Sequence, residues 1–257
     1  MTRQRAILLR WAPAIGVVGA ILLWQVAATF GPVSTNLFPG PFQVLQSAIN
    51  YPVGQLFEDV KVSLLRLLAG FGLAILAGVV LGALSAGTVL GRRLINAPME
   101  LLRPIPPLAW IAVAVIWLGL GESPKVFIIF VAAVFPIYVA TVRGLKTIDP
   151  TLTEAGRSLG VTRRGVMARI QLPAAAPDIA TGLRVGWGLA FTALVGAEVI
   201  SAKSGLGYMV MEARSNADIP LIVYGVFVIG VLGWVTDWLI QKLLMERYLA
   251  WHFRGVS

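Results

Sequence analysis

The chain has 257 residues, of which 58% are hydrophobic and only 13% are charged, and its mean hydropathy is +0.83. Soluble domains carry about 25% charged residues, so this composition excludes an ordinary soluble domain and predicts a membrane protein. There is no cysteine and a single histidine, His252, which excludes disulfides and thiolate metal sites, and no metal site is expected. The formal net charge of +9 would suit nucleic acid, so the placement of the basic residues must be considered.

Six stretches are long and apolar enough to cross a bilayer, which takes about 20 predominantly apolar residues. They are Trp11–Phe30, Val62–Ser85, Met99–Leu118, Val126–Val142, Ile179–Ile200 and Ile219–Leu244. Small residues recur within them as Gly78-x-x-x-Gly82 and Gly182-x-x-x-Gly186, a spacing that lets helix backbones approach closely in lipid. The predicted fold class is therefore all-α, a polytopic membrane bundle of about six transmembrane helices.

The first apolar stretch belongs to a run without any charge between Arg10 and Glu58. A secretory signal peptide is the alternative interpretation of its first part, but no small-residue cleavage site directly follows it. The second part holds four prolines between Pro32 and Pro52, which predict an outer loop with a short surface helix.

Lysine and arginine are in excess in the cytoplasmic segments of membrane proteins. With a cytoplasmic N-terminus, these segments hold Arg3, Arg5, Arg10, Arg92, Arg93, Arg143, Lys146, Arg157, Arg163, Arg164, Arg169, Lys242, Arg247 and Arg254. The outer segments hold only Lys61, Lys125, Lys203 and Arg214. This bias predicts that both termini are cytoplasmic. It also explains the net positive charge by topology, so no nucleic-acid partner is expected.

Three prolines interrupt the start of the third span: Pro104, Pro106 and Pro107. They free backbone carbonyls inside the bilayer, which is tolerated only where the segment faces protein or a watery cavity. Arg103 beside them offers a bidentate fork to an oxyanion, or anchors the span at the interface. Trp110 lines the same path, or belongs to an interfacial belt of aromatic residues. We expect these five residues to mark the translocation path.

The longest cytoplasmic loop contains the charged segment "EAGRSLGVTRRGVMARIQLP". Thr151 and Glu154 have the spacing of a capping box at the start of a short helix, and Gly160 fits a left-handed stop at its end. Thr162 is expected to cap a second short helix that ends at Pro173. The pattern predicts two short helices outside the membrane.

A solvated basic loop that only enforces orientation is the alternative interpretation of this loop, residues 149–178. Both predicted helices carry an apolar stripe, however, which needs a surface to cover it. The stripe comprises Ala155, Leu159, Val161, Val166, Met167, Ile170 and Leu172. A docking role is therefore favoured.

The same residues resemble the EAA loop of bacterial ABC-importer permeases, with the spacing E-A-A-x3-G-x9-I-x-L-P. The residues in register are Glu154, Ala155, Gly160, Ile170, Leu172 and Pro173, while Gly156 replaces the second alanine. The resemblance extends from about Val62 to Arg247 and implies a type I importer permease fold. It also implies that these residues form coupling helices, which dock on a separate cytoplasmic ATPase.

The resemblance implies a homodimer in the lipid of a bacterial inner membrane, two ATPase subunits and an outer solute-binding protein. The chain lacks a G-x-x-x-x-G-K-[ST] loop, so no cofactor is expected in it; ATP would be bound by the ATPase partner. The chain is then a transport subunit and not an enzyme. Its expected domains are an N-terminal helix with an outer loop (1–60), the permease domain (61–247) and a cytoplasmic tail (248–257).

Two further segments, "LLRPIPPLAWIAVAVIWLGLGESPK" and "AEVISAKSGLGYMV", resemble the branch of this family that imports sulfonates, nitrate or bicarbonate, and taurine permeases in particular. The favoured solute is taurine or another sulfonate. A nitrate- or bicarbonate-type permease is the alternative within the superfamily, and an ATP-independent secondary transporter is the alternative of another class. An intramembrane enzyme is disfavoured because no H-E-x-x-H motif or pair of catalytic acids is present.

Glu198 is an acid near the outer end of an apolar span. Intramembrane carboxylates usually pair with a cation or serve function, and Arg66 and Lys61 are the expected partners. A structural salt bridge is the favoured interpretation, and a gate on the translocation path is the second.

Overall fold

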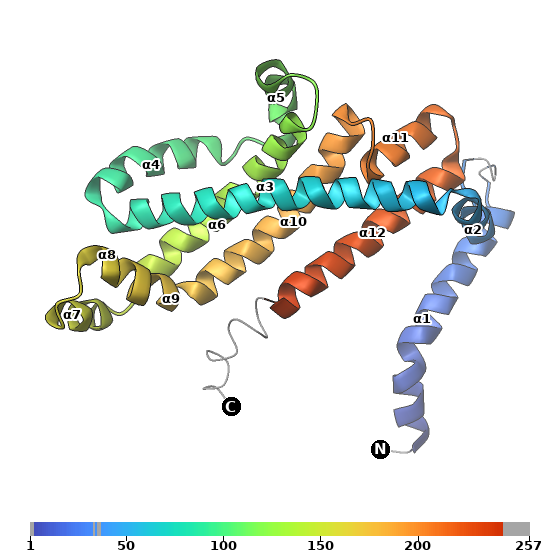
Figure 1. Ribbon diagram of the computed structural model, residues 1–257. Helices are drawn as coiled ribbons and strands as arrows, with labels where there is room; N and C mark the ends of the chain where they lie inside the picture. Colours follow the sequence, from blue (N-terminus) through green and yellow to red (C-terminus); the bar gives the residue numbers. More distant parts are fainter. Residues whose placement is uncertain (1–2, 33, 35–36, 244–257) are drawn as a thin grey trace.

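The computed structural model describes residues 3–32, 34 and 37–243 (Figure 1). The helices are α1 (Arg3–Phe30), α2 (Pro41–Asn50), α3 (Val53–Gly87), α4 (Val89–Leu102), the 3-10 helix η1 (Pro107–Trp110), α5 (Ile111–Leu118), α6 (Ser123–Lys146), α7 (Pro150–Ser158), α8 (Arg163–Val166), the π-helical turn η2 (Met167–Gln171), α9 (Leu172–Ala174), α10 (Ala176–Ser201), α11 (Leu206–Ser215) and α12 (Ile219–Gln241). No strand occurs among the described residues, which confirms the all-α class. Leu244, His252 and the predicted tail, 248–257, lie outside the described residues.

Helix α6 forms the centre of the bundle, packed between α3 and α10. A Cβ added at Gly78 would lie 2.8 Å from Ile137 Cγ2, and one added at Gly82 would lie 2.7 Å from Thr141 Cβ. On the other side, a Cβ at Gly182 would collide with the side chain of Ala140. Both pairs of small residues therefore let α3 and α10 approach α6 within one chain.

Four helices, α3, α6, α10 and α12, are long and apolar enough to cross a membrane. Helix α4 and the η1–α5 segment pass the same test only together, and they meet at an angle of 94°. In the first predicted span, only the shorter apolar segment Ile15–Phe30 was found. Among the described residues, the predicted six spans are thus four, or five with the bent pair, because the first apolar segment is too short and prolines break the third.

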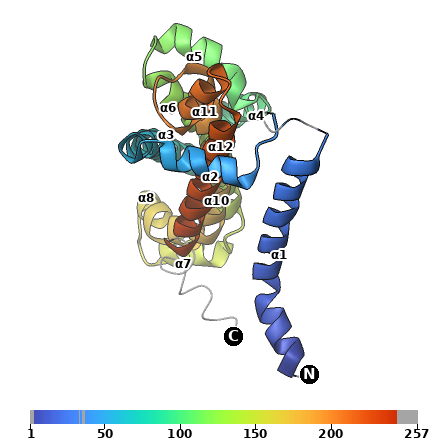
Figure 2. The same ribbon diagram turned by 90° about the vertical axis from the view of Figure 1, so that its right-hand side faces the viewer.

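Helix α1 stands beside the other helices (Figure 2). It contacts them near its C-terminal end, where the Trp24 ring stacks on Phe227 with 5.7 Å between ring centroids. The Trp24 Nε1–H also donates to the Pro39 carbonyl oxygen at 3.1 Å. The predicted short surface helix follows as α2. Helix α11 was not predicted, since the sequence analysis assigned no element between the last two predicted spans.

The bundle has two distinct ends (Figure 1). Helices α2 and α11 lie at one, which we call the α11 end, and the short helices α7 and α8 lie at the other, the α7 end. Arg163 Nη2 donates to the Gly87 carbonyl oxygen at 2.9 Å, which joins α8 to the last turn of α3 at the α7 end. The segments with predicted cytoplasmic arginines around α7 and α8 are thus separated from the predicted outer segments around α2 and α11.

Candidate functional site

The first candidate site is the α7–α9 segment at the α7 end. Helix α7 begins at Pro150, and the Asp149 carboxylate caps it by accepting the Thr151 amide N–H at 2.9 Å. This hydrogen bond holds the pKa of Asp149 below its usual range. The predicted Thr151–Glu154 capping box is therefore wrong, because Asp149 already occupies the N-cap. Glu154 lies exposed in α7.

The turn between α7 and α8 has the predicted geometry. Gly160 has a φ of +78°, which confirms the left-handed stop, and the Thr162 Oγ1 accepts the Gly165 amide N–H at 3.3 Å as the predicted cap. The prediction that Pro173 ends the second helix is wrong. Pro173 lies within a continuous run of helical turns from α8 through η2 to α9, directly after the π-helical turn.

The α7–α9 segment covers only part of its apolar surface itself. Gly156 is buried, and a Cβ at this position would collide with the end of the Ile170 side chain, so glycine allows α7 to pack closely on η2. By contrast, Leu152 of α7 and Leu159 directly after its end are 51% and 83% exposed. With Ala155 they form a stripe at helical spacing that no described residue covers. Of the other matched residues, Leu172 is half-buried and Pro173 is exposed.

The second candidate site is the break between α4 and η1. The helix ends at Leu102, and the chain turns through exposed Pro104 and Pro106 before η1 starts at Pro107. The predicted interruption of this span is thus confirmed. Trp110, at the end of η1, is half-buried, and its Nε1–H has no hydrogen-bond partner among the described residues.

Two cavities flank α6 near this break. One, of about 370 Å³, lies between α4 and α6 and includes Asn96, Glu100 and Lys146 in its lining. The other, of about 410 Å³, lies between α6 and α10. Arg103 and Arg143 line both cavities.

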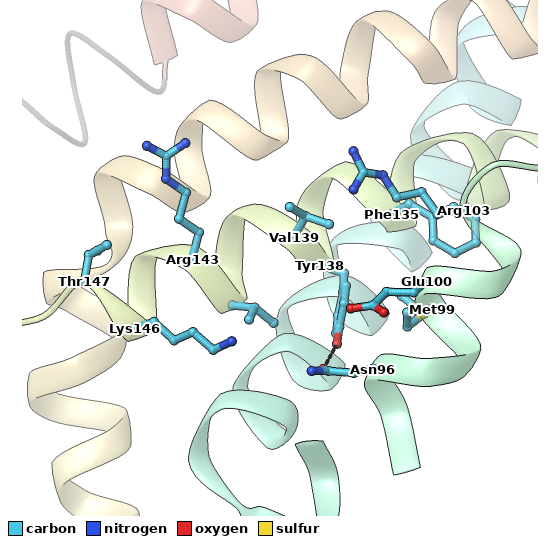
Figure 3. A pocket seen from close by; sticks show the side chains of 11 residues that line it. Asn96, Met99, Glu100, Arg103, Phe135, Tyr138, Val139, Arg143, Lys146 and Thr147 are labelled. Atoms are coloured by element: carbon cyan, nitrogen blue, oxygen red, sulfur yellow. Dashed lines mark hydrogen bonds between the residues drawn. The ribbon is translucent and has the colours of Figure 1, made fainter. Parts of the chain in front are cut away.

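Figure 3 shows the two guanidinium groups on the same side of α6, directed away from Asn96. Neither Arg103 nor Arg143 makes a side-chain hydrogen bond or ion pair with another residue in the described part of the chain. Two cations therefore lie in open cavities with free donors.

The third candidate site is a buried charged cluster at the α11 end, built around Arg66 of α3. The Arg66 Nη1 lies 2.7 Å from Glu198 Oε1 of α10 and donates at 2.7 Å to the Ser204 carbonyl oxygen. Glu198 also accepts the Ser63 hydroxyl at 2.8 Å and the Gly207 amide at 2.9 Å. The predicted salt bridge of Glu198 is thus present.

Lys61, the other predicted partner of Glu198, instead pairs with Glu58 on the surface at 3.1 Å. The sequence analysis missed Glu122, whose carboxylate pairs with Arg66 and, at 2.8 Å, with Lys125. The hydrogen bond from Arg66 lowers the pKa of Glu122 to about 2. Glu198 is 1% exposed and lies apart from both cavities at α6.

The same cluster reaches the loop before α3 through Asp59. Its Oδ1 accepts the Gly205 amide N–H at 2.9 Å, and its Oδ2 accepts the Tyr51 hydroxyl at 2.9 Å. Burial, reinforced by the hydrogen bond to Asp59, raises the pKa of Tyr51 above its usual range. The cluster thus fastens α3, α6, α10 and the start of α11 to one another.

These features define a polytopic membrane helix bundle with open charged cavities, and comparison with known proteins identifies its class. The pattern of the family described as "binding-protein-dependent transport system inner membrane component" matches residues 62–244. The chain belongs to this family of inner-membrane ABC-transporter permeases.

Curated relatives align over nearly the whole chain. The putative aliphatic sulfonates transport permease protein SsuC of Escherichia coli K12 is 35% identical, with 95% of this chain and 93% of that protein covered. The taurine transport system permease protein TauC of the same organism is 32% identical, with 93% and 89% covered. Among solved structures, inward-facing MetNI methionine ABC transporter shares the fold with a TM-score of 0.60, 18% identity, and 79% of this chain and 97% of that chain covered.

Proposed function

We propose that two copies of this permease form the membrane pathway of an importer for a small organic sulfonate. In this proposal, separate ATPase subunits dock at the α7 end, which is cytoplasmic along with both termini, and a solute-binding protein delivers the solute at the α11 end. The observation that carries the proposal is the open position of Arg103 in the break between α4 and η1, where it lines two cavities.

Arg103 has the chemistry that a sulfonate requires. A guanidinium group is always charged and presents a planar fork of donors to an oxyanion. A charge in a membrane segment is costly unless it is paired or faces a watery cavity, and Arg103 is exposed beside two cavities. The names of the sulfonate and taurine relatives support the same solute class.

A second copy would complete the path. Pro104 and Pro106 are exposed on this chain, and the carbonyls that prolines free from a helix each cost several kcal/mol in lipid. Covering the break with a second copy removes it from lipid and leaves a shared, wet interior. Two Arg103 side chains would then face one passage.

The α7–α9 segment is the proposed ATPase-coupling element. Its exposed stripe, with Leu152 and Leu159, needs an apolar groove on a partner, and the exposed Glu154 beside the stripe can contact the rim of that groove. Since the sequence has no phosphate-binding loop of the G-x-x-x-x-G-K-[ST] type, ATP hydrolysis is assigned to that partner.

The solute proposal is tested by uptake into liposomes that contain the permease with its ATPase, supplied with the binding protein. Wild type should accumulate taurine or an alkanesulfonate in preference to nitrate. Arg103→Ala should lower uptake about tenfold, because one charge-assisted interaction is lost, and Arg103→Lys should lower it less. If Arg103→Ala lowers uptake only in proportion to the amount of assembled complex, Arg103 is an interfacial anchor and the path assignment is wrong.

The coupling proposal is tested with Gly160→Val. A β-branched residue at a φ of +78° costs roughly 1–2 kcal/mol and shifts α7 relative to α8, so stimulation of ATP hydrolysis by solute and binding protein should fall severalfold while the membrane helices stay folded. Gly119→Val is the matched control, because Gly119 has a φ of +76° and equally open surroundings in the α5–α6 loop. Normal stimulation in Gly160→Val would refute the coupling role.

A further inference from the structure

The cavity between α6 and α10 contains charges of both signs. Besides Arg103 and Arg143, its lining includes Asp178 in the first turn of α10 and Thr181 one turn later. In the part of the chain that the structure describes, the Asp178 carboxylate makes no ion pair or hydrogen bond, and the Arg143 guanidinium makes none either. Opposite charges thus line one cavity of about 410 Å³ without neutralising each other.

Helix α6 places Arg143 on the open strip that faces both cavities. Phe135, Val139 and Arg143 follow each other at a spacing of four residues and line both cavities (Figure 3). Neighbouring residues such as Ile137 and Thr141 are fully buried. With a rise of 1.5 Å per residue, Arg143 lies about 12 Å along α6 from Phe135, towards the α7 end. Arg103 lies at the Phe135 end of the strip (Figure 3), so the two arginines are successive positions along one groove.

We propose that this cavity is a binding site for a zwitterion that carries a sulfonate and an ammonium group, with Arg143 holding the sulfonate and Asp178 the ammonium. The inference rests on the proposed function and narrows its solute class to aminosulfonates. A guanidinium fork matches sulfonate oxygens, and a carboxylate accepts the N–H groups of an ammonium. A solute with both groups neutralises both open charges at once, which a simple alkanesulfonate does not.

Helix electrostatics offers the competing explanation. Arg143 and Lys146 lie in the last turn of α6, and Asp178 lies in the first turn of α10, positions at which such charges stabilise the helix dipole. Lys146 shares this dipole position but lines only the cavity between α4 and α6. It is therefore the matched control for Arg143.

The test compares uptake of taurine with uptake of ethanesulfonate, which lacks the amine, by the full complex in liposomes. The uptake by each variant is divided by the uptake by wild type, measured with the same binding protein. The selectivity of the binding protein then cancels from this ratio. Arg143→Gln should lower uptake of both solutes about tenfold, while Lys146→Gln should leave both near wild type. Asp178→Asn should lower taurine uptake about tenfold, the scale of one charge-assisted hydrogen bond, and leave ethanesulfonate uptake unchanged.

Two results would overturn this inference. They are an unchanged ratio of taurine uptake to ethanesulfonate uptake in Asp178→Asn, and equal uptake by Arg143→Gln and Lys146→Gln. Each would assign the charges to helix stabilisation alone. Failure of the proposed function looks different, because the wild-type complex would then accumulate neither sulfonate.

Discussion

Two kinds of arginine occur in the same membrane domain, and their surroundings are opposite. Arg66 is one kind, and Arg103 and Arg143 are the other. Arg66 is 3% exposed and donates to two carboxylates and to Ser204. Arg103 and Arg143 are exposed to cavities and have no side-chain partner among the described residues. The number of partners, and not the charge itself, therefore separates an arginine that holds helices together from one that is available to a solute.

The strongest test of this comparison is removal of the paired arginine. Arg66→Ala leaves Glu198 as an unpaired buried carboxylate, which should destabilise the bundle by about 3–5 kcal/mol. We expect a much lower yield of assembled complex and a lower unfolding temperature in detergent. Lys61→Ala is the control, since its exposed pair with Glu58 should contribute less than about 1 kcal/mol. Wild-type assembly and unfolding temperature in Arg66→Ala would show that the cluster does not hold the helices.

Replacement of the buried acid should have an intermediate effect. Glu198→Gln keeps an oxygen that can accept from Ser63 or Gly207 but loses the charge opposite Arg66. The free energy of unfolding should fall by about 1–3 kcal/mol, which a lower unfolding temperature would report. The taurine uptake of the molecules that do assemble should stay normal. Loss of uptake with full assembly would instead support the gate interpretation of Glu198.

The smallest effect is expected at the exposed rim of the cluster. The pKa of Glu122 is lowered from 4.5 to about 2, so its stabilising pair is fully present above about pH 4.5 and is lost as the pH falls towards 2. Glu122→Gln lacks this contribution at every pH. The difference in unfolding temperature between wild type and Glu122→Gln should therefore be small and positive at pH 5 and shrink as the pH approaches 2. A constant difference over this range would show that the ion pair with Arg66 contributes nothing.

The charged cluster shows where sequence reasoning works and where it stops. The Glu198–Arg66 pair was predictable because an acid in an apolar span needs a cation, and few are available at that end. Glu122 was missed because it precedes α6 in a loop, and only the packing of α6 against α3 brings it to Arg66. The prediction that Lys61 pairs with Glu198 was wrong, because Glu58, only three residues away, pairs with Lys61 instead.

In the α7–α9 segment, too, the sequence predicted correctly only features that depend on a few neighbouring residues. Gly160 and Thr162 act as predicted because a left-handed turn and a cap depend on a few neighbouring residues. The capping residue of α7 was misassigned, although Asp149 followed by Pro150 is itself an N-terminal signal. The cavity role inferred for Arg143 had no sequence signal, because the same residue also satisfies the cytoplasmic charge bias.

The glycines that fit α3 and α10 against α6 limit how the permease can move. Gly78, Gly82 and Gly182 leave no room for even one added carbon next to α6, and closely packed surfaces of this kind resist sliding and rotation. The three helices should therefore tilt as one rigid body during the transport cycle. In the proposed pair of copies, access to the groove would then alternate through rocking of one copy against the other, with the bend between α4 and η1 as the place within each copy that can flex.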